Sequence, residues 1–272
     1  MTHAFGPQTT VVISPHLDDA VLSAWSVLTS SDAVKVVTLY AGIPDPGFVT
    51  DLDRAHGAKE SAAWLRKRRA EDLAALALAG CEAIHLDRLE VQFPAYRLPG
   101  VRERIAHDPT EFLSTVAQEP KLRTDPDDIV RLIDSHVPSR SVVYGPSGIG
   151  RHPDHRDVAR AVVRLFGRVR EVRLYADSPY YLFRGMPTWL NVAPNPEADE
   201  WCQAALSLVA RNNSRLVRQV VRLNNASLKR KWAAIERYET EFPLIVADMR
   251  RLGISRDWMR YETFWTLESH SR

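Results

Sequence analysis

Two short polar segments contain the residue types that chemistry at a metal ion requires. Segment 15–19 reads Pro-His-Leu-Asp-Asp, and segment 152–155 reads His-Pro-Asp-His. Two imidazoles and one carboxylate are a common ligand set for catalytic zinc, and they leave one position open for water. A remaining carboxylate could then act as a base and a remaining imidazole as an acid. Taken together, the two segments indicate a metallohydrolase.

Each segment taken alone has a simpler interpretation. Asp18 or Asp19 could cap a helix and complement its dipole. His152 could likewise be a polar helix cap, with Pro153 in the first turn of the helix. His152 and His155 are three residues apart, however, so they lie on the same face of a helix start. Both segments also follow apolar strands, and the carboxyl ends of parallel strands meet at one edge of a sheet.

The elements that must position these residues alternate along the chain. Short apolar, β-branched runs predict strands, and amphipathic stretches between them predict helices. This alternation predicts an α/β fold with a Rossmann-like, doubly wound and mostly parallel sheet. The expected strands are 11–14, 34–40, 83–87, 141–144 and 172–176, and the expected helices are 18–28, 54–79, 125–135 and 153–166.

We expect the whole chain, residues 1–272, to form one domain. Residues 88–124 have no clear period and contain several prolines, which indicates an insertion with some helix. Residues 197–272 are expected to form a mostly helical C-terminal extension. Within that extension, stretch 211–231 holds seven basic side chains and no acidic one.

The basic stretch predicts an amphipathic helix. Arg211, Arg215, Arg218 and Arg222 recur at helical spacing, and apolar residues supply the other face. One interpretation is a solvated helix face over a core stripe. The other is a contact with an acyl chain, an anionic substrate or a membrane surface.

Composition excludes several classes of protein. Lys and Arg number 36 against 34 Asp and Glu, so no strong field indicates a nucleic-acid partner. The two cysteines, Cys81 and Cys202, are too few for a disulfide framework or a cysteine-rich zinc site. We expect no transmembrane segment, because no apolar run reaches ~18 residues. The start of the chain lacks the basic and apolar regions of a signal peptide, so we expect a cytoplasmic protein.

In order and spacing, these motifs resemble the PIG-L/LmbE-like zinc-dependent N-deacetylases. The first family signature, Pro/Ala-His-x-Asp-Asp, matches segment 15–19, and the second, His-x-Asp-His, matches segment 152–155. A weaker element, Arg-x-x-Glu, matches residues 68–71 in a helix that Gly80 closes. The resemblance covers about residues 11–165.

The resemblance implies which residues bind the metal ion and which residue acts as the base. It implies that His16, Asp19 and His155 bind Zn²⁺ and that Asp18 is the general base. The same ligand set would also accept Fe(II) or Co(II). Ala20 stands where many family members have a glutamate, so one carboxylate of the usual pattern is missing here.

For the second motif the resemblance implies acid chemistry and substrate contacts. His152 would be an imidazolium that stabilises the oxyanion and protonates the leaving amine, with Asp154 as the partner that holds its charge and orientation. Arg68 matches a position that binds substrate hydroxyls. Some members have a tyrosine where this chain has Gly150, so tyrosine assistance would come from elsewhere, or its role would fall to Arg151.

The activity that the resemblance implies is removal of the N-acetyl group from an N-acetylglucosaminyl unit of a glycoconjugate. Segment 15–23 is similar to the branch that acts in natural-product pathways, including those of teicoplanin-type glycopeptide antibiotics. One alternative is a deacetylase of an N-acetylglucosaminyl thiol conjugate or an aminoglycoside. Another is a non-catalytic carbohydrate- or lipid-binding protein on the same fold, against which the intact Asp18 and His152 argue.

Overall fold

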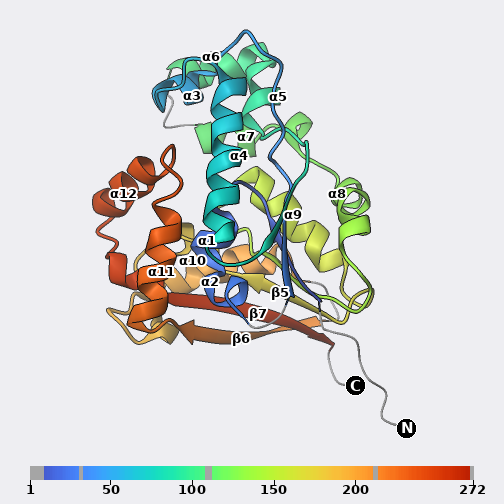
Figure 1. Ribbon diagram of the computed structural model, residues 1–272, viewed down its shortest axis with the longest axis vertical. Coiled ribbons are helices and arrows are strands. Elements are labelled where there is room, and N and C mark those ends of the chain that lie inside the picture. Colours follow the sequence, from blue (N-terminus) through green and yellow to red (C-terminus); the bar gives the residue numbers. More distant parts are fainter. Residues whose placement is uncertain (1–8, 31–32, 108–111, 211–213, 270–272) are drawn as a thin grey trace.

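The computed structural model describes residues 9–30, 33–107, 112–210 and 214–269. A seven-stranded sheet with the order β3-β2-β1-β4-β5-β7-β6 runs through the described residues (Figure 1). The strands are β1 (Thr9–Ser14), β2 (Ala33–Thr38), β3 (Glu82–His85), β4 (Val142–Pro146), β5 (Glu171–Tyr175), β6 (Ser214–Arg222) and β7 (Tyr261–Ser269).

The first five strands form the parallel part of the sheet. β1 pairs in parallel with β2 on one side and β4 on the other, so that Val12 lies opposite Val36 and Val11 opposite Val143. These valines are buried because helices cover both faces of the sheet. Strand order reverses between β1 and β4, which places a crevice at their carboxyl ends. The predicted doubly wound α/β fold is confirmed.

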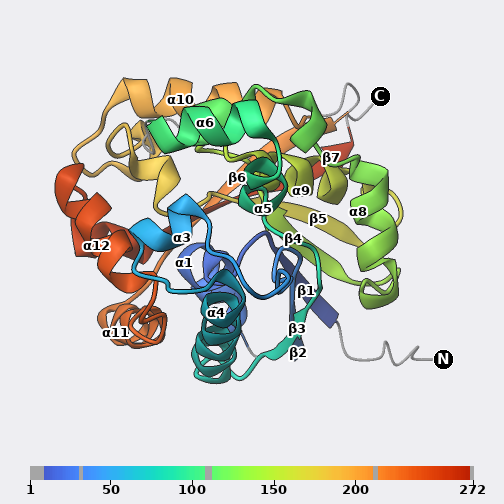
Figure 2. The same ribbon diagram turned by 90° about the horizontal axis from the view of Figure 1, so that it is seen from above.

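Helices cover the two faces of the sheet (Figure 2). One side carries α1 (Asp19–Ser23), α2 (Trp25–Leu28), α4 (Ser61–Ala77) and α11 (Asn225–Ile235), and the other carries α8 (Pro126–Ile133), α9 (Pro153–Arg164) and α10 (Pro196–Ser207). Four further helices gather at one end of the molecule, above α4 in Figure 1: α3 (Asp51–Ala55), α5 (Gln92–Tyr96), α6 (Pro99–His107) and α7 (Phe112–Ala117). Among the helices that the structure describes, none combines the length and the apolar character that crossing a bilayer requires.

The single long helix expected over 54–79 is wrong at its start. Gly57 has a φ of +94°, a left-handed conformation that ends α3, and α4 begins four residues later. The Ser61 hydroxyl donates a hydrogen bond to Asp53 and so links the first residue of α4 to α3. The Ala- and Arg-rich composition indicated helix correctly, but it did not show the break.

The expectation of a basic amphipathic helix is also wrong. Residues 214–222 form β6, which pairs antiparallel with β7 along its whole length at the edge of the sheet. Val217 and Val220 favour a strand, and arginines at every third or fourth position do not exclude one. Arg215 binds Glu268, and Arg218 lies over the Trp189 ring. Arg211 lies outside the described residues. Charged side chains on an edge strand discourage pairing with another chain.

The insertion around 88–124 folds as α5, α6 and α7 with a small core of its own. That core includes Val91, Val101, Phe112 and Val116, all of them buried. From the C-terminal region, α12 (Phe242–Arg251) also reaches the carboxyl edge of the sheet. The insertion and α12 therefore both add walls around the crevice.

Candidate active site

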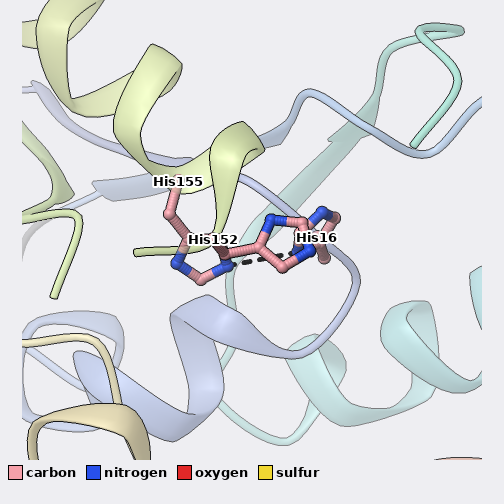
Figure 3. A group of neighbouring side chains, drawn as sticks. All are labelled: His16, His152 and His155. Carbon is pink, nitrogen blue, oxygen red and sulfur yellow. Dashed lines mark hydrogen bonds between the residues drawn. The ribbon is translucent and has the colours of Figure 1, made fainter. Parts of the chain in front are cut away.

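Three histidines meet at the carboxyl ends of β1 and β4 (Figure 3). His16 follows β1, while His152 and His155 lie at the start of α9, just after β4 and its glycine-containing turn. One ring nitrogen from each lies within 4.8 Å of those of the other two. The predicted convergence of the two polar segments is present in the structure.

The side chain of Asp19 completes a set of three metal-binding atoms. Nε2 of His155 lies 3.2 Å from Nδ1 of His16 and 3.2 Å from Oδ2 of Asp19. Nδ1 of His16 lies 3.4 Å from the same carboxylate oxygen. Tetrahedral zinc with bonds of about 2.0–2.2 Å requires ligand atoms roughly 3.3–3.5 Å apart. The arrangement of His16, Asp19 and His155 fits such an ion.

Each of the two histidines is oriented by a carboxylate on its far nitrogen. His16 Nε2 donates to Asp154 Oδ2 at 3.0 Å, and His155 Nδ1 donates to Asp177 Oδ1 at 2.6 Å. These bonds fix the tautomers, so the nitrogens that face Asp19 retain their lone pairs. Asp177 also accepts hydrogen bonds from the backbone of Ser147 and Ile149, which holds the turn after β4.

Asp177 is a residue that the sequence analysis missed. It is the second residue after β5, at the same edge of the sheet as the two motifs. A carboxylate at the end of a third parallel strand was the available signal. Because the residue belongs to no recognisable spacing, only the position of the strand could have indicated it.

Asp154 orients a different histidine from the one expected. Its carboxylate binds His16 and accepts a hydrogen bond from the backbone N–H of Val91, at 3.0 Å each. Its contact with His152 is through the backbone, where the Asp154 N–H donates to His152 Nδ1 at 3.2 Å. The structure therefore assigns Asp154 to the orientation of a metal-facing histidine.

Charge in the cluster favours a bound cation. Burial opposes charge on His155, but Asp19 and Asp177 raise its pKa to about 9. Hydrogen bonds to Asp154 and Asp19 likewise raise the pKa of His16 well above its ordinary value, against the effect of burial. The carboxylates that stabilise protons on these imidazoles would stabilise a metal cation in the same place.

Asp18 lies beside this set, and its carboxylate is not engaged. No hydrogen bond within the described residues involves that carboxylate, which lines the cavity next to His16 and Asp19. Its backbone has a φ of 134°, which is unusual for a residue with a side chain, and the carboxylate does not cap the helix that follows. Burial and then the charges of Asp19 and Glu241 raise the pKa of Asp18 well above its ordinary value. A carboxylate with a raised pKa is suited to accept a proton.

His152 is held as a neutral imidazole. Burial, followed by the positive charge of His16, lowers its pKa to about 3. Because Nδ1 accepts the Asp154 N–H, the neutral ring carries its proton on Nε2. The resting side chain is thus a hydrogen-bond donor without charge, which differs from the imidazolium that the resemblance implies.

His16, Asp18, Asp19 and His152 line a cavity of about 380 Å³. The loop after β1 and His152 form its floor. Its walls come from α3, residues 90–92 of the insertion, segment 178–183 after β5, and residues 241–248 at α12. The walls therefore come largely from the segments outside the two motifs.

The two predicted substrate-binding arginines differ in position. Arg68 lines the cavity but is buried, and its guanidinium contacts Glu90 at 2.7 Å and Glu241 at 3.1 Å. Arg151 is exposed, is not among the residues that line the cavity, and places its guanidinium 4.8 Å from the centre of the Trp201 ring. The structure brings Arg68 to the site and leaves Arg151 outside it.

Tyr180 also lines the cavity, and it packs against the backbone of Gly150. Its ring lies edge-on to His155, with the centroids 5.5 Å apart. A Cβ atom on Gly150 would be 2.6 Å from the Cβ and Cγ of Tyr180, and Gly150 has a φ of +95°. The glycine is therefore required for the close approach of this tyrosine to the metal-facing histidine.

We expect Gly150→Ala to reduce activity at least about tenfold and to destabilise the fold by about 1–3 kcal/mol, the scale of local backbone strain. Acetate release and thermal unfolding measure the two effects. Gly167→Ala is the matched control, because Gly167 has a φ of +85° and open space around it. Equal activities of the two variants would contradict a role for the Gly150–Tyr180 contact in the site.

Known proteins resemble this chain in sequence or in fold. The curated 2'-N-acetylparomamine deacetylase of Niallia circulans is 26% identical over 190 residues, which are 62% of this chain and just under two thirds (66%) of that protein. A deacetylase of the teicoplanin biosynthesis pathway has the same fold, with a TM-score of 0.65, 24% identity and coverage of 97% of this chain and 99% of that one. The A40926 pseudoaglycone deacetylase also has this fold, with a TM-score of 0.63 and 22% identity. The match covers 98% of this chain and 99% of that one.

The family comparison covers the part of the chain that holds both motifs. The model of the PIG-L family, described as GlcNAc-PI de-N-acetylase, matches residues 11–166. This range is more than half of the chain, and it runs from β1 through α9. It therefore includes His16, Asp18, Asp19, His152 and His155. The chain belongs to the PIG-L family of deacetylases.

Proposed function

We propose that the protein is a zinc-dependent N-deacetylase that removes the acetyl group from an N-acetylglucosaminyl unit of a glycoconjugate, in the biosynthesis of a secondary metabolite. The observation that carries this proposal is the convergence of His16 Nδ1, Asp19 Oδ2 and His155 Nε2 beside the unengaged carboxylate of Asp18. The family match and the two antibiotic-pathway deacetylases of the same fold support it.

His16, Asp19 and His155 would hold the metal ion. When bound, zinc supplies Lewis-acid chemistry, which polarises a carbonyl and makes water more acidic. Asp154 and Asp177 keep the two imidazoles in the tautomers that this binding requires. Two histidines with one carboxylate also suit Fe(II) or Co(II), so we test these metals beside zinc.

Asp18 would accept the proton of the attacking water. Its carboxylate is held next to the ligands by the strained loop, and its raised pKa allows it to keep the proton for later transfer to the amine. His152, as a neutral donor through Nε2, would bind the oxygen of the acetyl carbonyl as negative charge develops there. A donor placed in this way is usually worth about 10²–10³ in rate.

The walls of the cavity are proposed to bind the rest of the glycoconjugate. Free N-acetylglucosamine would contact the floor but would leave the insertion and α12 largely unused. Binding energy from remote parts of a substrate raises the rate only when those parts are present. We therefore expect a low kcat/KM for the free sugar and a higher value for an N-acetylglucosaminyl conjugate.

The test is acetate release by metal-depleted protein to which zinc, Fe(II) or Co(II) is returned in measured amounts. We expect activity to reach its maximum at one ion per chain and to disappear again with a chelator. Activity that is independent of metal would overturn the proposal. Carbohydrate binding without acetate release in any metal form would favour the non-catalytic alternative.

One variant distinguishes His152 from the metal ligands. His152→Ala should lower kcat by about 10²–10³, because it removes a donor to the reacting oxygen, while one metal ion per chain is retained. Metal analysis and turnover on the same preparation measure the two quantities. Loss of the metal from this variant would show that His152 is a ligand and would contradict the assignment.

A further inference from the structure

A backbone N–H of the insertion reaches the residues that face the metal. The N–H of Val91 donates to Oδ2 of Asp154 at 3.0 Å, and the same oxygen lies 3.0 Å from Nε2 of His16. Val91 and Asp154 are buried, so loss of this bond would leave a buried carboxylate oxygen short of a donor. A donor from outside the two motifs thus helps to hold the carboxylate that orients His16.

The residues on both sides of Val91 are held by buried polar contacts. Oε1 of Glu90 lies 2.7 Å from Nη1 of Arg68, and Oε2 accepts a hydrogen bond from the Gln92 side chain at 2.8 Å. Gln92 in turn accepts a hydrogen bond from the Thr50 hydroxyl at 2.9 Å. All four of these side chains are buried. The N–H of Val91 is therefore placed by a network that ties the insertion to α4 and to the start of α3.

Arg68 connects this network to the opposite wall of the cavity. It lies on α4, and its Nε is 3.1 Å from a carboxylate oxygen of Glu241, which directly precedes α12. Two of the three guanidinium nitrogens thus face carboxylates of the chain itself. A buried charge that has partners on two different segments is suited to fixing those segments relative to each other.

We infer that Arg68 and Glu90 are positioning residues of the metal site. Through the N–H of Val91 they hold the Asp154 carboxylate, and that carboxylate orients His16. The inference rests on the proposed function, since it takes His16 as a metal ligand. A direct contact between Arg68 and substrate hydroxyls would instead affect substrate binding and leave metal affinity unchanged.

Proline at position 91 tests the N–H itself. Val91 has a φ of −54°, which the proline ring favours, and the preceding Glu90 lies outside any helix, so the backbone accommodates Val91→Pro. Val91→Ala is the matched control, because it also alters the buried side chain but keeps the N–H. We expect Val91→Pro to weaken zinc binding by at least about tenfold and Val91→Ala to stay within about threefold of the original affinity. Competition with a chromophoric chelator measures zinc affinity without turnover, and thermal unfolding shows whether each variant is folded.

Glu90→Gln tests the side chains that place this N–H. The change removes one carboxylate charge, while Glu241 still accompanies Arg68, so no buried cation is left without a partner. We expect zinc affinity to fall by about threefold or more, because an outer partner of a ligand is disturbed. Amide hydrogen exchange at residue 91, followed by NMR, should become faster in the same protein.

Asp87→Asn is the matched control for this change. Asp87 pairs at 3.0 Å with Arg69, the neighbour of Arg68 on α4, but Asp87 is exposed and is not among the residues that line the cavity. This variant should leave both zinc affinity and amide exchange at residue 91 unchanged.

The outcomes separate the inference from the function on which it rests. Equal zinc affinities of Val91→Pro and Val91→Ala would overturn the role of the N–H, and Glu90→Gln decides alone if Val91→Pro does not fold. A Glu90→Gln protein with the original zinc affinity would overturn the positioning role, and a raised KM would then assign the pair to substrate binding. In these cases the deacetylase function would stand, whereas no zinc binding by the unsubstituted protein would overturn the proposed function itself.

Discussion

Replacement of His155 by alanine is expected to remove bound metal and activity together. His155 Nε2 is the central atom of the ligand set, at 3.2 Å from both His16 Nδ1 and Asp19 Oδ2. Its side chain is 1% exposed, and Asp177 holds its other nitrogen, so the position of Nε2 is fixed from two sides. We expect metal affinity to fall by more than about 100-fold, beyond the usual effect of losing an outer partner of a ligand. Metal content after dialysis and acetate release measure the result.

Two further variants make this prediction specific. Asp177→Asn should weaken metal binding by about 10–100-fold, because His155 loses the carboxylate that fixes its tautomer. His85→Ala is the matched control, since His85 is another buried histidine at a strand end and is bound to Asp72 at 2.7 Å. It should reduce stability but keep one metal ion per chain. A His155→Ala protein that retains stoichiometric metal would contradict the ligand assignment.

The site floor could be predicted from sequence because its residues are local. His16, Asp18 and Asp19 occupy one loop, and His152 and His155 occupy one helix start, so each motif carries its own geometry. The valine-rich β1 and β4 are buried on both faces and indicate parallel strands, which bring the two motifs to one edge. The residue types of the two motifs therefore indicated a metal site, and their positions after parallel strands indicated the edge of the sheet where it lies.

The parts that sequence did not predict depend on contacts between distant segments. Asp177 and His155 are 22 residues apart, and no spacing pairs them. Arg68 is paired with Glu90 from the insertion and Glu241 beside α12, and both partners are too distant in the sequence for the motif to indicate them. β6 forms because β7 lies beside it, and the local arginine spacing did not reveal that partner.

Replacement of Asp18 by asparagine should lower kcat by about 10² or more while the metal ion stays bound. Asparagine keeps the shape of the side chain and tolerates a positive φ better than most residues, so the loop at φ 134° should be preserved. Asparagine cannot accept the proton of water, which removes the base. Turnover, metal content and thermal unfolding are measured together on the same sample.

The reason to expect a rate effect without metal loss lies in the geometry of the loop. Asp19 and the two histidines contact one another within 3.4 Å, whereas the Asp18 carboxylate belongs to none of these contacts. The nearest candidate to replace it is Glu241, whose charge contributes to the raised pKa of Asp18. Glu241 is, however, within 3.1 Å of Arg68, and this ion pair already occupies its carboxylate. An Asp18→Asn protein with the original rate would therefore assign proton transfer to a residue outside this loop, and the double variant with Glu241→Gln would identify whether Glu241 is that residue.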